Sequence, residues 1–459
     1  MVIKDLSKYA GSLKGYTELR VQQNYNSTIV LLDGSVINNS QVTSSGINSR
    51  VRNNGSWGFA SSSDVSEGSI KAVIEAANRN ASFLGSKILK DNKEFSIFSD
   101  SVYKDFSTKK IKYTRKELMD FLKEIDNYIV QKYPNVTSRR VMINSLDMEK
   151  SLITSQGATA YTLTPRSFVM VSLSLDKCGE VTEVYGLVGG FGQFEDNFDD
   201  PEKVFIKVDQ LYESLIKKSE GVYAKAGLKE CIMHADLAGI LAHEAIGHTT
   251  EADIVLGGSV AGDNLNKRVA SELVTLVDFA NTALGKQCPV PVFIDDEGVT
   301  CKDVTIIENG ILKGFMHNRD SAQHFGVEAT GNARAYEFND EPLIRMRNTA
   351  ILPGKSKLEE MISSIEDGYY LVQPSNGQAD TTSEFMFGIV MGYEIKNGKL
   401  GKAIKDTTIS GVAFDVLKSV TMISDDMSWT AAGMCGKKQP IPVGMGGPAI
   451  KCKINIGGR

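Results

Sequence analysis

The residues with the clearest chemical potential lie in the segment LAHEAIGHTTEAD, residues 241–253. His243 and His248 bracket Glu244, which directly follows the first histidine. The common metallopeptidase pattern places two histidines four residues apart on a helix, so that both imidazoles project from one face and share a zinc ion. Here the spacing is five. Histidines five apart differ by about 140° around a straight α-helix, against about 40° for four apart. The segment can hold one metal only if the helix is deformed.

A single π-bulge would return the two imidazoles to one side. Its i→i+5 hydrogen bond widens one turn of the helix, and such bulges are frequent at functional sites. Gly247 directly precedes His248, and glycine adopts backbone conformations that other residues avoid. The sequence therefore predicts a deformed helix, with Gly247 as the place of the distortion.

Glu244 offers the second part of a hydrolytic site. Beside a zinc-bound water, its carboxylate can accept a proton as the water attacks a carbonyl, and can return that proton to the leaving amine. A competing interpretation is a structural metal held by Cys231, His234, His243 and His248. That arrangement leaves Glu244 without a role, and we expect Cys231 on a strand ahead of the helix.

A catalytic zinc normally takes three protein ligands, so a third must be found. Glu251 and Asp253 lie just beyond the helix, but they can equally be solvated loop acids or partners that orient the imidazoles. The distal candidate is Cys435, in AAGMCGKKQPIPVGMGG. Its flanking glycines let the backbone approach a crowded site, and Lys437 favours the thiolate. The residues themselves leave these alternatives open.

Composition narrows the classes of protein that the chain can belong to. A length of 459 residues predicts two to three domains. The formal net charge of −5 gives no basic footprint for nucleic acid, and no apolar run approaches the roughly 20 residues that span a bilayer. The N-terminus has no export signal, and the six cysteines are scattered. We expect a cytoplasmic protein that binds neither nucleic acid nor membranes.

The pattern of residues 1–222 predicts an N-terminal α+β region, which can divide into two subdomains. Its first strands alternate around an Asp33-Gly34 turn, a good hairpin signal. Helices are predicted for SEGSIKAVIEAANRNASFLG, for TRKELMDFLKEIDNYIVQKYP and over roughly 203–219. YGLVGGFGQFEDNFDDPE breaks all periodicity and predicts a mobile loop.

Residues 223–459 predict a β-rich domain that opens with the histidine helix. VTIIENGILKGFM and GYEIKNGKLGKAI each show strand, Asn-Gly turn and strand. The expected fold class is therefore α+β with two domains, a mixed N-terminal region and a β-rich C-terminal domain that carries the zinc-site helix.

Several motifs, in this order, resemble the TldD branch of the TldD/PmbA metallopeptidase family. The N-terminal motif is INSRVRNNGSWGFAS; the later ones are HEAIGH with TEAD, IDDEGV, IENGILKGFM, TGNARAYEF, PLIRMRNTAILPG and GMCGKKQPIPVGMGGP. They cover nearly the whole chain, and the zinc-lacking PmbA-like (TldE) branch has no HExxxH motif. The resemblance implies that His243, His248 and Cys435 bind Zn²⁺ and that Glu244 is catalytic.

The resemblance also implies partners. Members form homodimers, or heterodimers with a PmbA/TldE-like paralogue, that enclose the active site in a cavity and cleave unfolded or small peptides. Arg345, within a family motif, could bind substrate or stabilise the oxyanion, or it could anchor a loop. The alternative function is a non-catalytic peptide-binding or assembly subunit with a structural metal, because a β-rich domain can capture peptides by strand addition.

Overall fold

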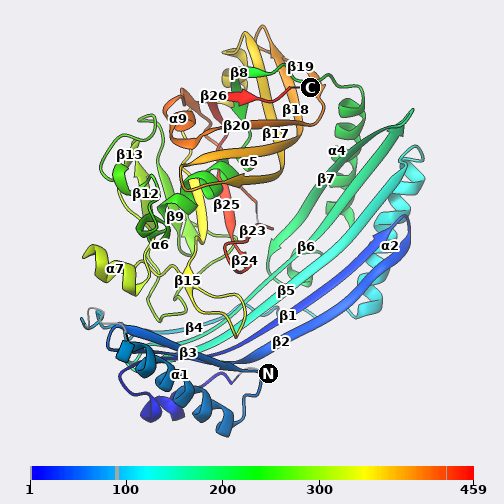
Figure 1. Ribbon diagram of the computed structural model, residues 1–459. Coiled ribbons are helices and arrows are strands. Elements are labelled where there is room, and N and C mark those ends of the chain that lie inside the picture. Colours follow the sequence, from blue (N-terminus) through cyan, green and yellow to red (C-terminus); the bar gives the residue numbers. More distant parts are fainter. Residues whose placement is uncertain (1–2, 88–92, 431, 459) are drawn as a thin grey trace.

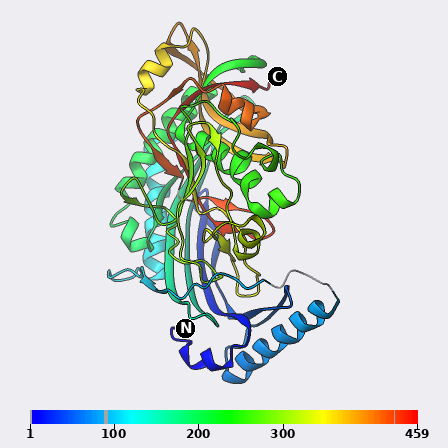
Figure 2. The same ribbon diagram turned by 90° about the vertical axis from the view of Figure 1, so that its left-hand side faces the viewer.

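The computed structural model describes residues 3–87, 93–430 and 432–458. A wide, curved N-terminal sheet cradles a β-rich C-terminal block (Figure 1). Turned by 90°, the green and yellow elements of the C-terminal block lie in front of the long strands of that sheet (Figure 2). The mixed α+β class with a β-rich C-terminal region is confirmed, whereas the boundary near residue 222 stays a prediction.

The N-terminal sheet has the strand order β3-β2-β1-β5-β6-β4, and β7 also pairs with β6. Neighbouring strands are antiparallel, except that β4 runs parallel to β6. The strands are β1 (Tyr16–Leu32), β2 (Ser35–Asn53), β3 (Ser56–Ser62), β4 (Ser101–Asp105), β5 (Ser138–Thr154), β6 (Thr159–Lys177) and β7 (Glu180–Phe191).

The two faces of this sheet make different contacts, because successive side chains along a strand point to opposite faces. The outer face carries apolar residues such as Leu19 and Ile29, and it packs against α1 (Glu67–Lys87), α2 (Arg115–Lys132) and α4 (Glu202–Ser219). The inner face carries polar residues. Gln22 donates to the Tyr336 carbonyl at 2.5 Å, so the inner face holds the C-terminal block.

The predicted turns and helices of the N-terminal region are confirmed. Asp33 and Gly34 both have positive φ, 51° and 81°, between β1 and β2, which suits a tight hairpin turn. At the start of α2, Thr114 accepts from the Glu117 amide while Glu117 bonds back to the Thr114 amide, a capping box that fixes the first turn.

The prediction of a mobile loop from Tyr185 onward is wrong for its first part. Residues 185–191 belong to β7, and the glycines that suggested a loop instead give space for close packing. A Cβ on Gly186 would lie 2.5 Å from Lys207 Cε of α4, and one on Gly189 would lie 2.5 Å from the Ser167 carbonyl oxygen of β6. Glycine is used at both positions for its small volume, and at Gly189 also because φ is +110°.

The C-terminal block contains two larger sheets. One has the order β17-β8-β26-β20-β18-β19, and the other β13-β12-β9-β16-β25-β22. The first comprises β8 (Gly227–Met233), β17 (Asp367–Ala379), β18 (Glu384–Lys396), β19 (Lys399–Ile404), β20 (Thr407–Val412) and β26 (Ile450–Ile456). The second comprises β9 (Leu276–Phe279), β12 (Val304–Glu308), β13 (Ile311–Leu312), β16 (Asn348–Ile351), β22 (Ser428–Thr430) and β25 (Gly444–Gly447). Both predicted Asn-Gly hairpins, β12–β13 and β18–β19, are confirmed.

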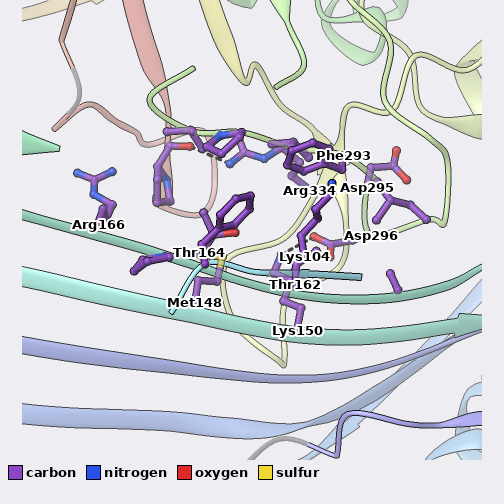
Figure 3. Close-up of a pocket in the computed structure, with 18 of the residues that line it drawn as sticks. Lys104, Met148, Lys150, Thr162, Thr164, Arg166, Phe293, Asp295, Asp296 and Arg334 are labelled. Atoms are coloured by element: carbon purple, nitrogen blue, oxygen red, sulfur yellow. Dashed lines mark hydrogen bonds and ion pairs between the residues drawn. The ribbon is translucent and has the colours of Figure 1, made fainter. Parts of the chain in front are cut away.

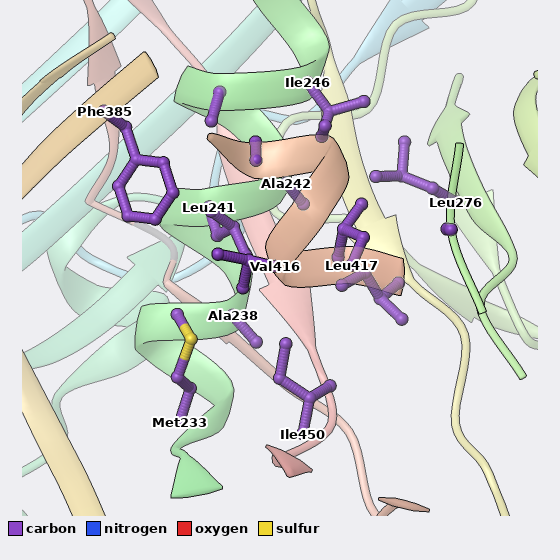
Figure 4. Close-up of a cluster of buried hydrophobic side chains, with 14 of the residues drawn as sticks. Met233, Ala238, Leu241, Ala242, Ile246, Leu276, Phe385, Val416, Leu417 and Ile450 are labelled. Atoms are coloured by element: carbon purple, nitrogen blue, oxygen red, sulfur yellow. The ribbon is translucent and has the colours of Figure 1, made fainter. Parts of the chain in front are cut away.

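The histidine helix lies in the core between these sheets. Figure 4 shows its apolar side chains packed against α9 (Ala413–Lys418) and neighbouring strands. The residues in this cluster include Met233, Ala238, Leu241, Ala242, Ile246, Leu276, Phe385, Val416, Leu417 and Ile450. Such packing fixes the helix, so its functional side chains start from a rigid base. Among the described residues, no helix is long and apolar enough to cross a membrane.

A buried ion pair joins β9 to Arg347, the residue that directly precedes β16. Asp278 and Arg347 are both 0% exposed, and Arg347 Nε donates to Asp278 Oδ2 at 2.9 Å. Asp278 Oδ1 also accepts from the amides of Arg347 and Asn348. We expect Asp278→Asn to lower the free energy of unfolding by about 3–5 kcal/mol in chemical denaturation, because it leaves a buried guanidinium without its counter-charge.

The matched control is Asp415→Asn on α9. Asp415 is 71% exposed and pairs with Lys418 on the surface, so its loss should change the free energy by less than about 0.5 kcal/mol. Equal effects of the two substitutions would mean that the Asp278 pair does not stabilise the block.

Candidate metal centre

The histidine helix is distorted as the spacing requires. α5 (Ala235–Ile240) continues into a π-helical segment, η2 (Leu241–Gly247), and then a short turn, η3 (His248–Thr250). The His248 amide donates to the His243 carbonyl, which is the i→i+5 bond of a widened turn. The two imidazole centroids lie 5.2 Å apart. The prediction of a π-deformed helix is confirmed.

The reason proposed for Gly247 is wrong. Its φ and ψ are −57° and −52°, ordinary right-handed helical values that any residue adopts. A Cβ at this position would instead lie 2.0 Å from Met346 Sδ. Gly247 therefore lets the helix approach the chain that carries Met346, next to β16.

Cys435 reaches this helix from a short ribbon, β23 (Met434–Cys435) paired with β24 (Ile441–Pro442). Its Sγ lies 3.3 Å from His248 Nε2. One ligand atom each from His243, His248 and Cys435 all lie within 4.8 Å of one another. Two imidazoles and a thiolate are a donor set suited to zinc, which prefers nitrogen and sulfur ligands.

The hydrogen bonding of these residues fits a role as metal ligands. His243 is 0% exposed, yet neither of its ring nitrogens has a hydrogen-bond partner among the described residues. Buried polar atoms normally have hydrogen-bond partners, so an imidazole without one is suited to act as a metal ligand. Burial alone would raise the pKa of the Cys435 thiol, but the two nearby imidazoles lower it to about 3. The sulfur is thus held as a thiolate, the form that binds metals.

Glu251, one local alternative for the third ligand, instead contacts the far side of a histidine. Its Oε2 lies 2.9 Å from His248 Nδ1, and the carboxylate is fully buried. Burial would lower the pKa of His248, but Glu251 and then Cys435 raise it to about 10. A carboxylate in this position fixes the ring and directs Nε2 toward the cluster.

Lys437, expected from the sequence to favour the thiolate, forms ion pairs with two carboxylates at the end of the histidine helix. Its Nζ lies 3.1 Å from Glu251 Oε2 and 2.7 Å from Asp253 Oδ2. Neither acid belongs to the group of three possible ligands. Lys437 therefore ties the cysteine ribbon to the end of the histidine helix.

Glu244 stands beside the cluster and keeps contact with solvent. Its side chain is 29% exposed, and Oε2 lies 3.7 Å from His248 Nε2. A carboxylate so placed can exchange a proton with a water molecule near the three ligand atoms.

Arg345 supports the loop-anchoring alternative. Its side chain is 0% exposed and donates to the carbonyls of Cys435 and Gln439, both at 2.7 Å. Two further arginines, which sequence reasoning missed, hold the same ribbon: Arg334 donates to the Pro442 carbonyl and Arg166 to the Gly433 carbonyl. Nothing in the sequence marks these contacts, because the partners lie far apart in the chain.

The competing structural metal site is not assembled. Cys231 is buried on β8, as its expected strand position implied. His234 caps the start of α5, where its Nδ1 accepts from the Asp236 amide at 3.3 Å. Neither residue is part of the three-residue group.

The chain matches known proteins along most of its length. The family model described as the PmbA/TldA metallopeptidase C-terminal domain matches residues 227–458, and that for domain 1 matches residues 17–81. A metalloprotease of Methanocaldococcus jannaschii is 33% identical over 451 residues, covering 95% of each chain. A zinc metalloprotease TldD homolog of Saccharolobus solfataricus is 31% identical over 419 residues, covering 90% of each.

A solved structure shares the fold. TldE from Thermococcus kodakarensis superposes with a TM-score of 0.73 at 18% identity, covering 99% of each chain. The likeness in fold, the matched C-terminal domain and the identity over nearly the full length agree with the metal-binding geometry. The chain belongs to the TldD/PmbA metallopeptidase family.

Proposed function

We propose that this chain is a zinc metallopeptidase that hydrolyses unfolded or small peptides. The observation that carries the proposal is the group formed by His243, His248 and Cys435, with Glu244 partly exposed beside it. The three residues would hold Zn²⁺. When bound there, zinc would supply a Lewis acid that makes a water molecule more acidic and polarises a peptide carbonyl.

The residues of the chain would perform the proton transfers. A carboxylate oxygen of Glu244 accepts a proton from the attacking water and delivers it to the nitrogen of the leaving amine as the peptide bond breaks. Glu251 keeps His248 in one orientation throughout. Lys437 compensates the charge of Glu251.

The proposal includes an assembly. A TldE structure is similar in fold to this chain, which supports pairing with a TldE-like paralogue or with a second copy, so that the site lies in an enclosed cavity. Such a cavity would admit extended chains and exclude folded proteins. The six cysteines are all free, which suits the reducing cytoplasm.

The first test replaces the proposed base. We expect Glu244→Gln to retain bound zinc and to lower the rate of peptide cleavage by roughly 10²- to 10⁴-fold, because the amide cannot accept the proton. Metal analysis and a peptide assay on the same sample measure both quantities. Glu359→Gln, an exposed residue of α8 (Leu358–Ser363), is the control. Cleavage by Glu244→Gln at the wild-type rate would remove Glu244 from the mechanism.

The second test asks which group completes the metal site. Cys435→Ser should lose most of its zinc, because a hydroxyl is a weak ligand beside two imidazoles. Glu251→Gln should keep the three ligands and bind zinc roughly 10- to 100-fold more weakly, since it only orients His248. Zinc titration followed by metal analysis distinguishes them. Full occupancy in Cys435→Ser would contradict the assignment.

The third test asks whether the metal is catalytic or structural. A structural metal is what the alternative function, a non-catalytic subunit, requires. Removal of zinc by a chelator should abolish cleavage and leave the thermal unfolding temperature nearly unchanged, because the histidine helix is already packed in the core. Added zinc should restore activity. If unfolding shifts strongly while no cleavage is measured before chelation, the metal braces the fold instead.

A further inference from the structure

A cleft lies between the inner face of the N-terminal sheet and the C-terminal block (Figure 3). The space between its lining atoms is about 870 Å³, a value that includes open solvent at its mouth. Its floor consists of side chains that face one another across β5 and β6, since alternate residues point to one face. The cross-strand pairs are Leu146–Arg166, Met148–Thr164, Lys150–Thr162 and Leu152–Ala160.

The opposite wall is rigid and mostly apolar. It is formed by the segment 289–296, which contains Pro289 and Pro291, together with Pro442 of β24. Proline fixes φ and so limits the freedom of this wall. The same β24 pairs with the strand that carries Cys435. The cleft and the metal centre therefore share one ribbon.

The carboxylates of the cleft already have partners. Asp296 Oδ2 lies 2.7 Å from Lys150 Nζ and 3.4 Å from Arg20 Nη1. Asp295 accepts from three backbone amides, those of Glu297, Val299 and Ala333. Neither acid is free to neutralise a further cation.

Arg166 is different, because it is a buried cation without a counter-charge. It is 7% exposed, and among the described residues no carboxylate is found to act on its guanidinium. Burial lowers its pKa to about 10. Nη1 donates to the Gly433 carbonyl at 3.1 Å and contacts Met434 Sδ at 3.7 Å, and the guanidinium carbon lies 5.6 Å from the centroid of the Phe168 ring. In Figure 3 it stands at one end of the cleft.

A second cation lines the same cleft. Lys104 Nζ lies 4.5 Å from the centroid of the Phe293 ring and, among the described residues, forms no ion pair. Together with Arg166 it gives an apolar cleft an excess of positive charge. Buried charges without partners are costly, so this arrangement favours an anionic ligand with an apolar body.

We propose that this cleft is a subsite for the carboxylate of a bound peptide, with Arg166 as the group that recognises it. The inference rests on the proposed function, since it places the subsite beside the cysteine ribbon. The carboxylate belongs to an acidic side chain or to the peptide C-terminus. Apolar side chains next to it pack against Leu146, Met148 and the proline wall.

The experiment measures binding of peptides by full-length, zinc-loaded protein that carries Glu244→Gln, so that bound peptides stay intact. Fluorescently labelled hexapeptides contain one Phe and either Glu or Gln, each with a free or an amidated C-terminus. We expect at least one carboxylate form to bind roughly 10- to 100-fold more tightly than the neutral peptide. The difference between the Glu series and the C-terminal series identifies the source of the carboxylate.

Adding Arg166→Gln should abolish this preference, whereas zinc content should be retained because Arg345 and Arg334 still hold the ribbon. The matched control is Arg140→Gln. Arg140 is an exposed arginine of β5 on the same inner face. It lies six residues, or about 20 Å, along the strand from Leu146, the residue that pairs with Arg166. Ala160→Phe narrows the cleft without touching Arg166 and should weaken every peptide.

Equal binding of charged and neutral peptides by the protein with an intact Arg166 would overturn the proposal. So would an Arg166→Gln variant that weakens all peptides equally, since Arg166 would then act only through the Gly433 carbonyl. If the Ala160→Phe variant is folded and binds the peptides as tightly as the parent protein, the peptide binds outside this cleft. Because binding is read without cleavage, failure of the subsite and failure of the peptidase proposal are distinguishable.

Discussion

The site depends on the placement of one short ribbon by buried guanidinium groups. Cys435 and His248 are 187 residues apart in the chain, and β23 and β24 are too short to fix the sulfur by their own pairing. Arg345, Arg334 and Arg166 instead donate to backbone carbonyls along the ribbon. Each contact satisfies a buried acceptor and limits the freedom of a segment that would otherwise be costly to order.

The charge at the centre of the site comes from the sulfur and the imidazoles. The pKa of the Cys435 thiol is lowered by His243 and His248, and its Sγ lies 3.3 Å from His248 Nε2. Glu251 and Cys435 both raise the pKa of His248, so negative groups lie on both sides of this ring. The same groups would stabilise a divalent cation. The cluster is thus built for positive charge at its centre.

Sequence reasoning succeeded where the signal was local. The five-residue spacing of the histidines required a π-turn, and the Asn-Gly dipeptides located two hairpins. It failed where glycine was needed for space, as at Gly189 and Gly247, because close packing between distant segments leaves no local pattern. The burial of Arg345 behind the ribbon has the same cause. A motif identifies such a residue without telling what its side chain touches.

The exposures of His243 and Glu244, which are adjacent on the helix, follow from their separate proposed roles. His243 is fully buried, as suits its proposed role as a metal ligand, whereas Glu244, the proposed base, is 29% exposed. A base must meet both water and substrate, so it cannot share the burial of the ligand beside it. Adjacent residues point in directions about 100° apart on a helix. One turn can therefore direct an imidazole into the core and a carboxylate toward the opening, and the widened turn then returns His248 to the imidazole's side.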